Sequence, residues 1–319
     1  MSDTDTRKES AHSGTPLEFE LPFSQIPERL DKVLAALLPE HSRSRLQGWI
    51  EAGHVHVNGE SARVRQQVFP RDRIQVWEQV SDEAKAFLPE AISLEIVAES
   101  PDWVVLNKPA GLVTHPGAGN WQGTLLNALL HHYPELAHVP RAGIVHRLDK
   151  DTSGILVVAR HDKAQTHLVR QLQARSMRRE YGAMVHQHVK ASGTVDLPVG
   201  RDRRIPVRMS VKQPVAPKQA VTHYDVARRG ALGDAAVTEL TCRLETGRTH
   251  QIRVHMAGIG HPLLGDTLYG GKLFEGCGRQ MLHARTLAFV DYQTGRTLEF
   301  QAPWPHDFEL LRQNIVWNS

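Results

Sequence analysis

Residues 143–160, GIVHRLDKDTSGILVVAR, place ionisable side chains between two short apolar runs. The polar positions are His146, Arg147, Asp149, Lys150, Asp151, Thr152 and Ser153. The apolar runs Gly143–Val145 and Ile155–Ala159 predict two strands joined by a turn. A carboxylate beside basic groups at the end of a buried strand is unfavourable unless it serves a function. Asp149 is therefore a candidate catalytic carboxylate, although the same residues would also suit a solvated turn.

The sequence lacks the motifs of a dinucleotide site and of a metal site. The glycines of HPGAGNWQGT, His115–Thr124, lack the spacing of G-x-G-x-x-G, and no G-K-[ST] follows them. The 19 histidines raise the question of a metal, but none lies in H-E-x-x-H, and no third carboxylate or cysteine has zinc spacing. We predict neither a dinucleotide site nor a metal site.

Positive charge is concentrated in one part of the chain. Three acidic residues, Glu180, Asp196 and Asp202, lie between positions 170 and 218. The basic residues there number 11 and are Arg170, Arg175, Arg178, Arg179, Lys190, Arg201, Arg203, Arg204, Arg208, Lys212 and Lys218. A basic block within a folded chain favours a polyanionic partner such as RNA. A merely solvated surface would show mixed signs.

The amino-acid composition indicates what kind of protein this is. Of 319 residues, 40% are hydrophobic and 23% charged, as in soluble globular proteins. No apolar run approaches the roughly 18 residues of a membrane helix, so we expect no membrane partner. Residues 1–20 start with a polar stretch that lacks the apolar core of a signal peptide, and we expect a disordered tail. Cys242 and Cys277 are too few for a disulfide framework, which fits a cytoplasmic protein.

A change of composition divides the chain. VSDEAKAFLP, at residues 80–89, is rich in charged and small residues and ends in proline. We interpret residues 80–90 as a linker between a small domain at 21–79 and a large domain at 91–319.

The small domain has the pattern of two helices and a hairpin. Helical spacing of leucine and valine predicts a helix over Glu28–Leu38, and Ser44 with Gln47 predicts a capping box at the start of a second helix. Asn58-Gly59 predicts a tight hairpin turn. This order resembles the small RNA-binding domain first known from ribosomal protein S-four, although a generic helix–hairpin module would share it.

Two arginines lie where that second helix begins. A helix N-terminus attracts anions, and Arg43 and Arg45 would strengthen a phosphate site there. We predict that this end of the small domain contacts RNA.

The large domain is rich in strands. We predict a helix after Thr124, a helix over 162–174, a strand with Tyr181 over 179–185, an exposed loop over 201–212, and a helix capped by Thr249. Further strands are predicted over 94–97, 103–106, 221–226, 236–244, 286–290 and 297–301. Strands and helices do not alternate strictly, so the predicted class is α+β with a mixed, mainly antiparallel sheet.

Three motifs occur together and in a fixed order. They are HRLDKDTSG at 146–154, REYGAMV at 179–185 and LETGRTHQIRVHMA at 244–257. At these separations they resemble the pseudouridine synthases that modify ribosomal and transfer RNA, and the resemblance covers about Ala91 to Trp304. The surroundings of the first motif are similar to a branch acting on the large ribosomal subunit. The resemblance implies uridines in the helix 69 stem-loop of 23S ribosomal RNA as substrate, while residues 200–218 and those after Gly271 depart from that branch.

The implied reaction explains why Asp149 is needed. Uridine exchanges its N1–ribose bond for a C5–ribose bond with nothing gained or lost, so no cofactor is expected. Asp149 either attacks the anomeric carbon or removes the 2′ proton to give a glycal, and the sequence leaves both open. The resemblance implies that Arg253 opposes its charge, and that Tyr181 stacks on the uracil and handles the C5 proton.

Other residues receive roles in binding. The target uridine must flip out of its stack. Arg147 lies two residues before Asp149, so we expect it on the same strand face, placed to fill the vacancy with help from His146. Ile252 and Val254 are expected as apolar walls of the uracil pocket. RNA-binding positions are predicted at Arg43, Arg45, Arg178, Arg179, Arg203 and Arg204. We take a monomer as the default, and a non-catalytic RNA-binding ribosome-assembly factor stays the alternative.

Overall fold

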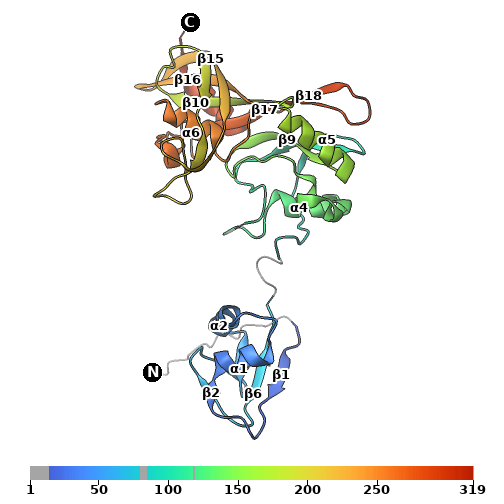
Figure 1. The fold of residues 1–319 in the computed structure, drawn as a ribbon. Coiled ribbons are helices and arrows are strands. Elements are labelled where there is room, and N and C mark those ends of the chain that lie inside the picture. Colours follow the sequence, from blue (N-terminus) through green and yellow to red (C-terminus); the bar gives the residue numbers. More distant parts are fainter. Residues whose placement is uncertain (1–13, 80–84, 118, 319) are drawn as a thin grey trace, which may run out of the picture. The chain divides into compact units, whose positions relative to one another are not determined.

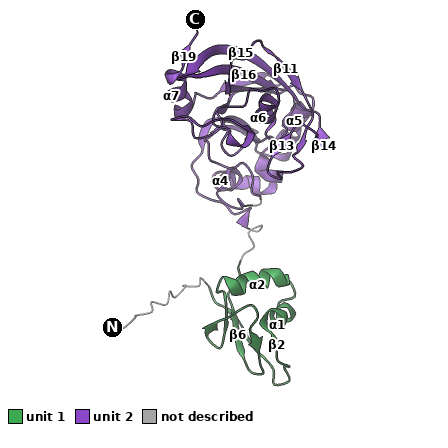
Figure 2. Cartoon of the chain, turned by 90° about the vertical axis from the view of Figure 1, so that its left-hand side faces the viewer, with its two compact units in different colours: residues 1–82 green, residues 83–319 purple. Residues whose placement is uncertain are grey.

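The computed structural model describes residues 14–79, 85–117 and 119–318. The chain divides into two compact units, Met1–Asp82 and Glu83–Ser319 (Figure 2). Most of the expected tail, residues 1–13, and positions 80–84 of the expected linker lie outside the described residues. The prediction of a disordered tail is wrong for its last residues, because Leu17–Glu20 forms strand β1, which pairs with β6.

Unit 1 consists of two helices and short antiparallel strands. Its elements are β1 (Leu17–Glu20), β2 (Glu28–Arg29), α1 (Leu30–Leu37), α2 (Arg43–Glu51), β3 (Val55–Val57), β4 (Glu60–Ser61), β5 (Gln67–Val68) and β6 (Arg73–Val76). Four strands form a sheet in the order β1-β6-β3-β4, and β2 pairs with β5. The predicted turn is present, since Asn58 and Gly59 both have positive φ, 53° and 83°.

The start of each helix in unit 1 differs from the prediction. Helix α1 begins at Leu30, because Glu28 and Arg29 form β2 instead. Helix α2 is capped by Ser42, whose side chain accepts a hydrogen bond from the Arg45 backbone N–H, and not by Ser44. Gln47 closes no capping box, because its side chain donates to the buried carboxylate of Asp31.

Unit 2 is built on one large sheet (Figure 1). Its strands are β7 (Glu95–Glu99), β8 (Trp103–Lys108), β9 (Ser153–Ala159), β10 (Arg178–His186), β11 (Gly193–Asp196), β12 (Val199–Arg201), β13 (Met209–Ser210), β14 (Val215–Lys218), β15 (Val221–Leu232), β16 (Ala235–Leu244), β17 (Leu282–Val290), β18 (Thr297–Gln301) and β19 (Val316–Trp317). Its helices are α4 (Leu125–His132), η1 (Pro134–His138), η2 (Pro140–Gly143), α5 (Asp162–Gln173), α6 (Gln251–Gly258), η3 (Thr267–Tyr269) and α7 (His306–Asn314).

The large sheet has the order β11-β15-β16-β10-β17-β9-β8-β7, with β18 on β17 and β19 on β15. All of its described pairings are antiparallel except that of β17 with β9. The predicted α+β class with a mixed, mainly antiparallel sheet is confirmed. Strand β17 comes late in the sequence but lies between β10 and β9, so it joins the two halves of the sheet.

One row of residues crosses the centre of the sheet. Tyr181 of β10 pairs with Ala284 of β17, and Ala284 pairs with Gly154 of β9. Gly154 has φ +115°, and a Cβ there would lie 2.1 Å from the Ala284 carbonyl oxygen. Only glycine fits this close approach. The row brings Tyr181 near the segment that precedes β9.

Three segments of unit 2 differ from the prediction. Gly143–Val145 is not a strand, because η2 ends at Gly143 and only Ile144 makes a bridge, to Val158. The expected loop over 201–212 contributes to a small sheet, β13-β12-β14. Thr249 does not cap α6. The residue directly before the helix is His250, and its side chain makes no capping hydrogen bond. No helix in the described part of the chain is long and apolar enough to cross a membrane.

Candidate active site

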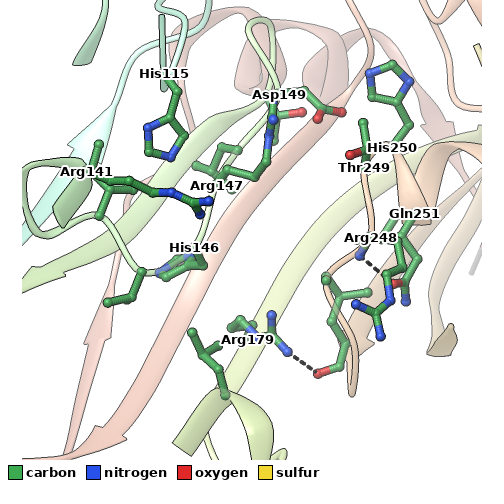
Figure 3. A pocket seen from close by; sticks show the side chains of 18 of the residues that line it. His115, Arg141, His146, Arg147, Asp149, Arg179, Arg248, Thr249, His250 and Gln251 are labelled. Atoms are coloured by element: carbon green, nitrogen blue, oxygen red, sulfur yellow. Dashed lines mark hydrogen bonds between the residues drawn. The ribbon is translucent and has the colours of Figure 1, made fainter. Parts of the chain in front are cut away.

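A pocket of about 720 Å³ opens in unit 2 between the segment that precedes β9, strand β10 and the start of α6. Figure 3 shows His115, Arg141 and Arg147 on one side, and Arg248, Thr249 and His250 on the other. The residues that line it and carry the argument are Arg147, Asp149, Arg179, Tyr181, Ile252 and Arg253. The three sequence motifs therefore meet in one place.

Asp149 lies on an irregular segment, not at the end of a strand as predicted. The segment is held through its own backbone: Thr114 Oγ1 donates to the Leu148 carbonyl at 2.6 Å, and Lys108 Nζ donates to the Lys150 carbonyl at 3.0 Å. Arg279 Nη1 donates to the Asp151 carbonyl at 2.9 Å. Side chains far away in the sequence thus fix the path of the chain on both sides of Asp149.

Lys108 is fully buried, with 0% of its surface exposed. Its ammonium group also donates to the carbonyls of Pro109 and Leu112, each at 2.8 Å. Burial lowers its pKa to about 7, against the opposing effect of the Asp149 and Asp151 charges. Sequence reasoning missed Lys108, because a single lysine at the end of an apolar strand carries no pattern of its own.

The Asp149 carboxylate is paired with Arg253 of α6. Arg253 Nη1 donates to Asp149 Oδ2 at 3.1 Å, through a single N–H. The bidentate partner of Arg253 is Asp266, with Nε–Oδ2 at 2.7 Å and Nη2–Oδ1 at 2.9 Å. Asp266 was not predicted. The side chain of Asp266 is 1% exposed and that of Asp149 is 15% exposed, so Asp149 is the carboxylate within reach of a ligand.

Tyr269 lies against the same arginine. The Arg253 guanidinium carbon is 5.1 Å from the centre of the Tyr269 ring. The Tyr269 hydroxyl is 2.8 Å from His250 Nδ1 and accepts the Met209 backbone N–H at 2.9 Å. Arg253 is therefore fixed by a carboxylate and a ring, which leaves Nη1 directed at Asp149.

Tyr181 lies on β10 and is 6% exposed. Burial raises the pKa of its hydroxyl, and the nearby Asp149 charge acts in the same direction. The hydroxyl therefore keeps its proton at neutral pH, which suits a group that stacks on a base and moves a proton.

The structure brings Ile252 to the pocket but not Val254. Val254 is buried among Val199, Met209, Ala220 and Tyr269, and it does not line the pocket. The prediction for Val254 is wrong, because residues two apart on an α-helix point about 200° apart.

Arg147 and His146 also differ from the prediction. Arg147 is exposed at the pocket, on the irregular segment and not on a strand face shared with Asp149. His146 Nε2 accepts the Val157 backbone N–H at 3.3 Å. Burial lowers the pKa of His146 to about 3, and Arg179 adds to the effect. The ring is thus neutral, it is partly buried in the pocket lining, and its helping role stays a prediction.

The other arginines predicted to bind RNA lie in different settings. Arg203 and Arg204 are exposed beside β12, whereas Arg178 is exposed and paired with Glu180 and Glu299. Arg43 binds the buried Asp31, and Arg45 donates to the Gln79 carbonyl. Arg179 is not on the surface, because its strand turns it into the pocket wall.

One group of possible metal ligands occurs among the described residues. Ligand atoms of Glu40, His41 and Glu78 lie within 4.8 Å of one another. Both glutamates are exposed, and the group belongs to unit 1. It shares no residue with the pocket.

Arg279 is expected to position Asp149. It pairs with Asp307 at the start of α7, with Nε–Oδ2 at 2.6 Å, and it also holds the Asp151 carbonyl. Arg279→Met should lower kcat by about 10²-fold with a smaller change in KM, because misplacement of a catalytic group by about 1 Å has that effect. Steady-state kinetics measure kcat and KM separately. Arg279→Lys should recover part of kcat. A change confined to KM would contradict this role.

Buried histidines are expected to make the protein less stable in mild acid. Burial lowers the pKa of His283, which bonds Ser153, to about 4, whereas an unfolded histidine titrates near about 6.5. As the pH falls from about 6.5 toward 4, the unfolded chain binds the extra proton, so the free energy of unfolding falls by up to about 1.4 kcal/mol per pH unit per histidine. Denaturant titrations at about pH 7.5 and about pH 5.5 measure this difference. His283→Gln should reduce it, and an undiminished difference would refute the assignment.

Comparison with known proteins defines the class. The profile of the family described as RNA pseudouridylate synthase matches residues 102–258, and that of the S4 domain matches residues 28–74. The chain belongs to the RNA pseudouridylate synthase family, as the three motifs predicted.

Individual relatives are similar over most of their length. The chain is 47% identical over 306 residues to "Ribosomal large subunit pseudouridine synthase D" of Pasteurella multocida, covering 92% of each chain. It is 48% identical over 310 residues to the protein of that name from Haemophilus influenzae, covering 92% of this chain and 94% of the relative. Among solved structures, "Human RNA Pseudouridylate Synthase Domain Containing 1" is similar, with a TM-score of 0.57 and 27% identity, covering 76% of this chain and 92% of that one.

Proposed function

We propose that this protein isomerises uridine to pseudouridine in large-subunit ribosomal RNA. The observation that carries the proposal is the pocket in which Asp149, paired with Arg253, shares the cavity with Tyr181. The names of the relatives support ribosomal RNA of the large subunit as the substrate. The helix 69 stem-loop of 23S RNA is the target that the sequence resemblance favours.

Asp149 supplies the chemistry in this proposal. Its carboxylate attacks the anomeric carbon or removes the 2′ proton, which breaks the N1–C1′ bond and frees the uracil from the ribose. The uracil then turns within the pocket and rejoins the sugar through C5. Arg253 pairs with the carboxylate and aims it, and Tyr181 stacks on the base and takes part in removing the C5 proton. Ile252 provides an apolar wall, and no cofactor is required, since the product is an isomer.

The parts of the chain have different roles in this proposal. We propose residues 21–79 as an RNA-binding domain, residues 80–90 as its linker and residues 91–319 as the catalytic domain. Arg203 and Arg204, which are exposed, contact phosphates of the RNA. The protein would act as a cytoplasmic monomer on 23S RNA or on the large subunit.

The test is a map of pseudouridine across ribosomal RNA from cells with and without the gene. Uridines that lose modification in the deletion strain, and regain it with purified protein on a transcript, identify the sites. A deletion strain with an unchanged map would remove the proposal. Purified protein that keeps its activity in a chelator would separate this reaction from metal-dependent hydrolysis.

Arg147 is expected to promote base flipping. It is an exposed cation that lines the pocket on the segment that carries Asp149, and base stacking is worth about 1–3 kcal/mol. Arg147→Ala should slow modification of a uridine in a stem by about 10- to 100-fold and that of an unstructured uridine much less. Single-turnover assays on paired and unpaired RNA substrates measure the two effects. Equal slowing on both would refute the flipping role.

A further inference from the structure

Arg179 is a buried cation without a counter-ion in the described structure. It is 6% exposed, and its Nη2 donates to the backbone carbonyls of Leu244 and Glu245 at 3.3 and 3.2 Å. Its Nε is buried without a hydrogen-bond partner, and no carboxylate of the described residues forms an ion pair with it. Burying an unpaired charge is strongly unfavourable, so a partner for this cation is expected.

The guanidinium lies in the wall of the pocket and not in the protein core. Arg179 and Tyr181 are two apart on β10, so both side chains point to the same face of the strand, and both line the cavity. Figure 3 shows Arg179 in the cavity with Asp149, and its bond to the loop after β16. A Cβ at Gly247 would be 2.9 Å from Arg179 Nη1, so the loop leaves room for this arginine.

We propose that Arg179 binds a backbone phosphate of the RNA strand next to the flipped uridine. The inference rests on the proposed function. A neutral uracil carbonyl would accept a hydrogen bond but would leave the positive charge uncompensated, whereas phosphate supplies both an acceptor and the missing negative charge. Phosphates are the anionic groups of RNA. The phosphates on the 5′ and 3′ sides of the uridine share this chemistry.

Binding to a stem-loop RNA with the helix 69 sequence tests the proposal. All proteins carry Asp149→Asn, so that affinity is measured without turnover. One RNA carries an uncharged methylphosphonate 5′ to the target uridine and another carries it 3′, each with the neighbouring 2′-hydroxyl removed to preserve the linkage. Control RNAs have the same deoxy positions with ordinary phosphates.

One of the two methylphosphonates should raise Kd by about 10- to 100-fold, the worth of a charge-assisted contact. Arg179→Met should raise Kd by a similar factor on the control RNA, should show no further loss on that methylphosphonate RNA, and should reduce the slope of log K against log salt by about one. Arg296→Met, an exposed arginine in the β17–β18 turn, provides the matched control.

Two outcomes would overturn the proposal: neither methylphosphonate weakens binding, or the losses from Arg179→Met and from the methylphosphonate add. The comparison of methylphosphonate and control RNAs uses protein with an unchanged Arg179. It therefore tests the proposal even if Arg179→Met fails to fold. Wild-type protein that binds with the expected phosphate dependence but forms no pseudouridine would refute the proposed function and leave the phosphate site standing.

Discussion

Asp149→Asn is expected to abolish pseudouridine formation, with a fall in rate of about 10⁴-fold or more, while RNA binding is retained. Asparagine keeps the shape of the side chain and the hydrogen bond from Arg253 Nη1, but it is neither a nucleophile for the sugar nor a base. Asp149 is 15% exposed, so the loss of its charge leaves the outer surface unchanged.

The measurement is single-turnover formation of pseudouridine together with RNA affinity for the same protein. Asp151→Asn is the matched control, because it is two residues away and Arg279 uses its backbone carbonyl and not its carboxylate. Pseudouridine formed by Asp149→Asn at the wild-type rate would refute the catalytic role of Asp149, whereas a wild-type protein that binds the RNA but forms no pseudouridine would favour the alternative, a non-catalytic RNA-binding factor. Loss of RNA binding in Asp149→Asn would instead indicate a structural role.

Arg253→Met is expected to have the next largest effect, on stability as well as on rate. The change leaves the buried Asp266 and the partly buried Asp149 without their cation. Breaking such a buried pair costs about 3–5 kcal/mol in the free energy of unfolding. The rate should fall by at least about 10²-fold, since Asp149 also loses the group that aims it.

A double variant separates the two effects. Adding Asp266→Asn to Arg253→Met removes one of the unpaired charges, so unfolding in denaturant should show partial recovery of stability, while the rate stays low. Arg253→Lys should recover little activity, because a point charge does not reproduce the fork that binds Asp266 through Nε and Nη2 and Asp149 through Nη1. Equal stability of the single variant and the wild type would refute the account of the buried charges.

The sequence motifs pointed to three residues that the structure brings together. Asp149, Tyr181 and Arg253 lie in separate motifs, and the structure places all three on one pocket. The α+β class followed from strand and helix patterns, which are local. The fold class is confirmed because it depends on short, local patterns, whereas the catalytic roles, which rest on the family resemblance, stay predictions.

What the sequence did not indicate depends on tertiary contacts. Asp266, Lys108 and Arg279 hold Arg253 and the Asp149 segment from distant parts of the chain, and none belongs to a recognisable pattern. Arg179 has a charge that suggested the surface, yet strand alternation buries it. Val254 was assigned to the pocket although helical geometry directs it away from Ile252.

The central position of β17 has a consequence for synthesis of the chain. Strand β17 leaves the ribosome roughly a hundred residues after β10, a delay of roughly 5–20 s at about 5–20 residues per second. Until then β9 and β10 each have a free edge, and Gly154, which pairs with Lys108 of β8, lacks its second partner, Ala284. Arg253 and Asp266 also arrive after Asp149. A nascent chain that stalls before Leu282 therefore has unpaired strands that are prone to aggregation, and no assembled active site.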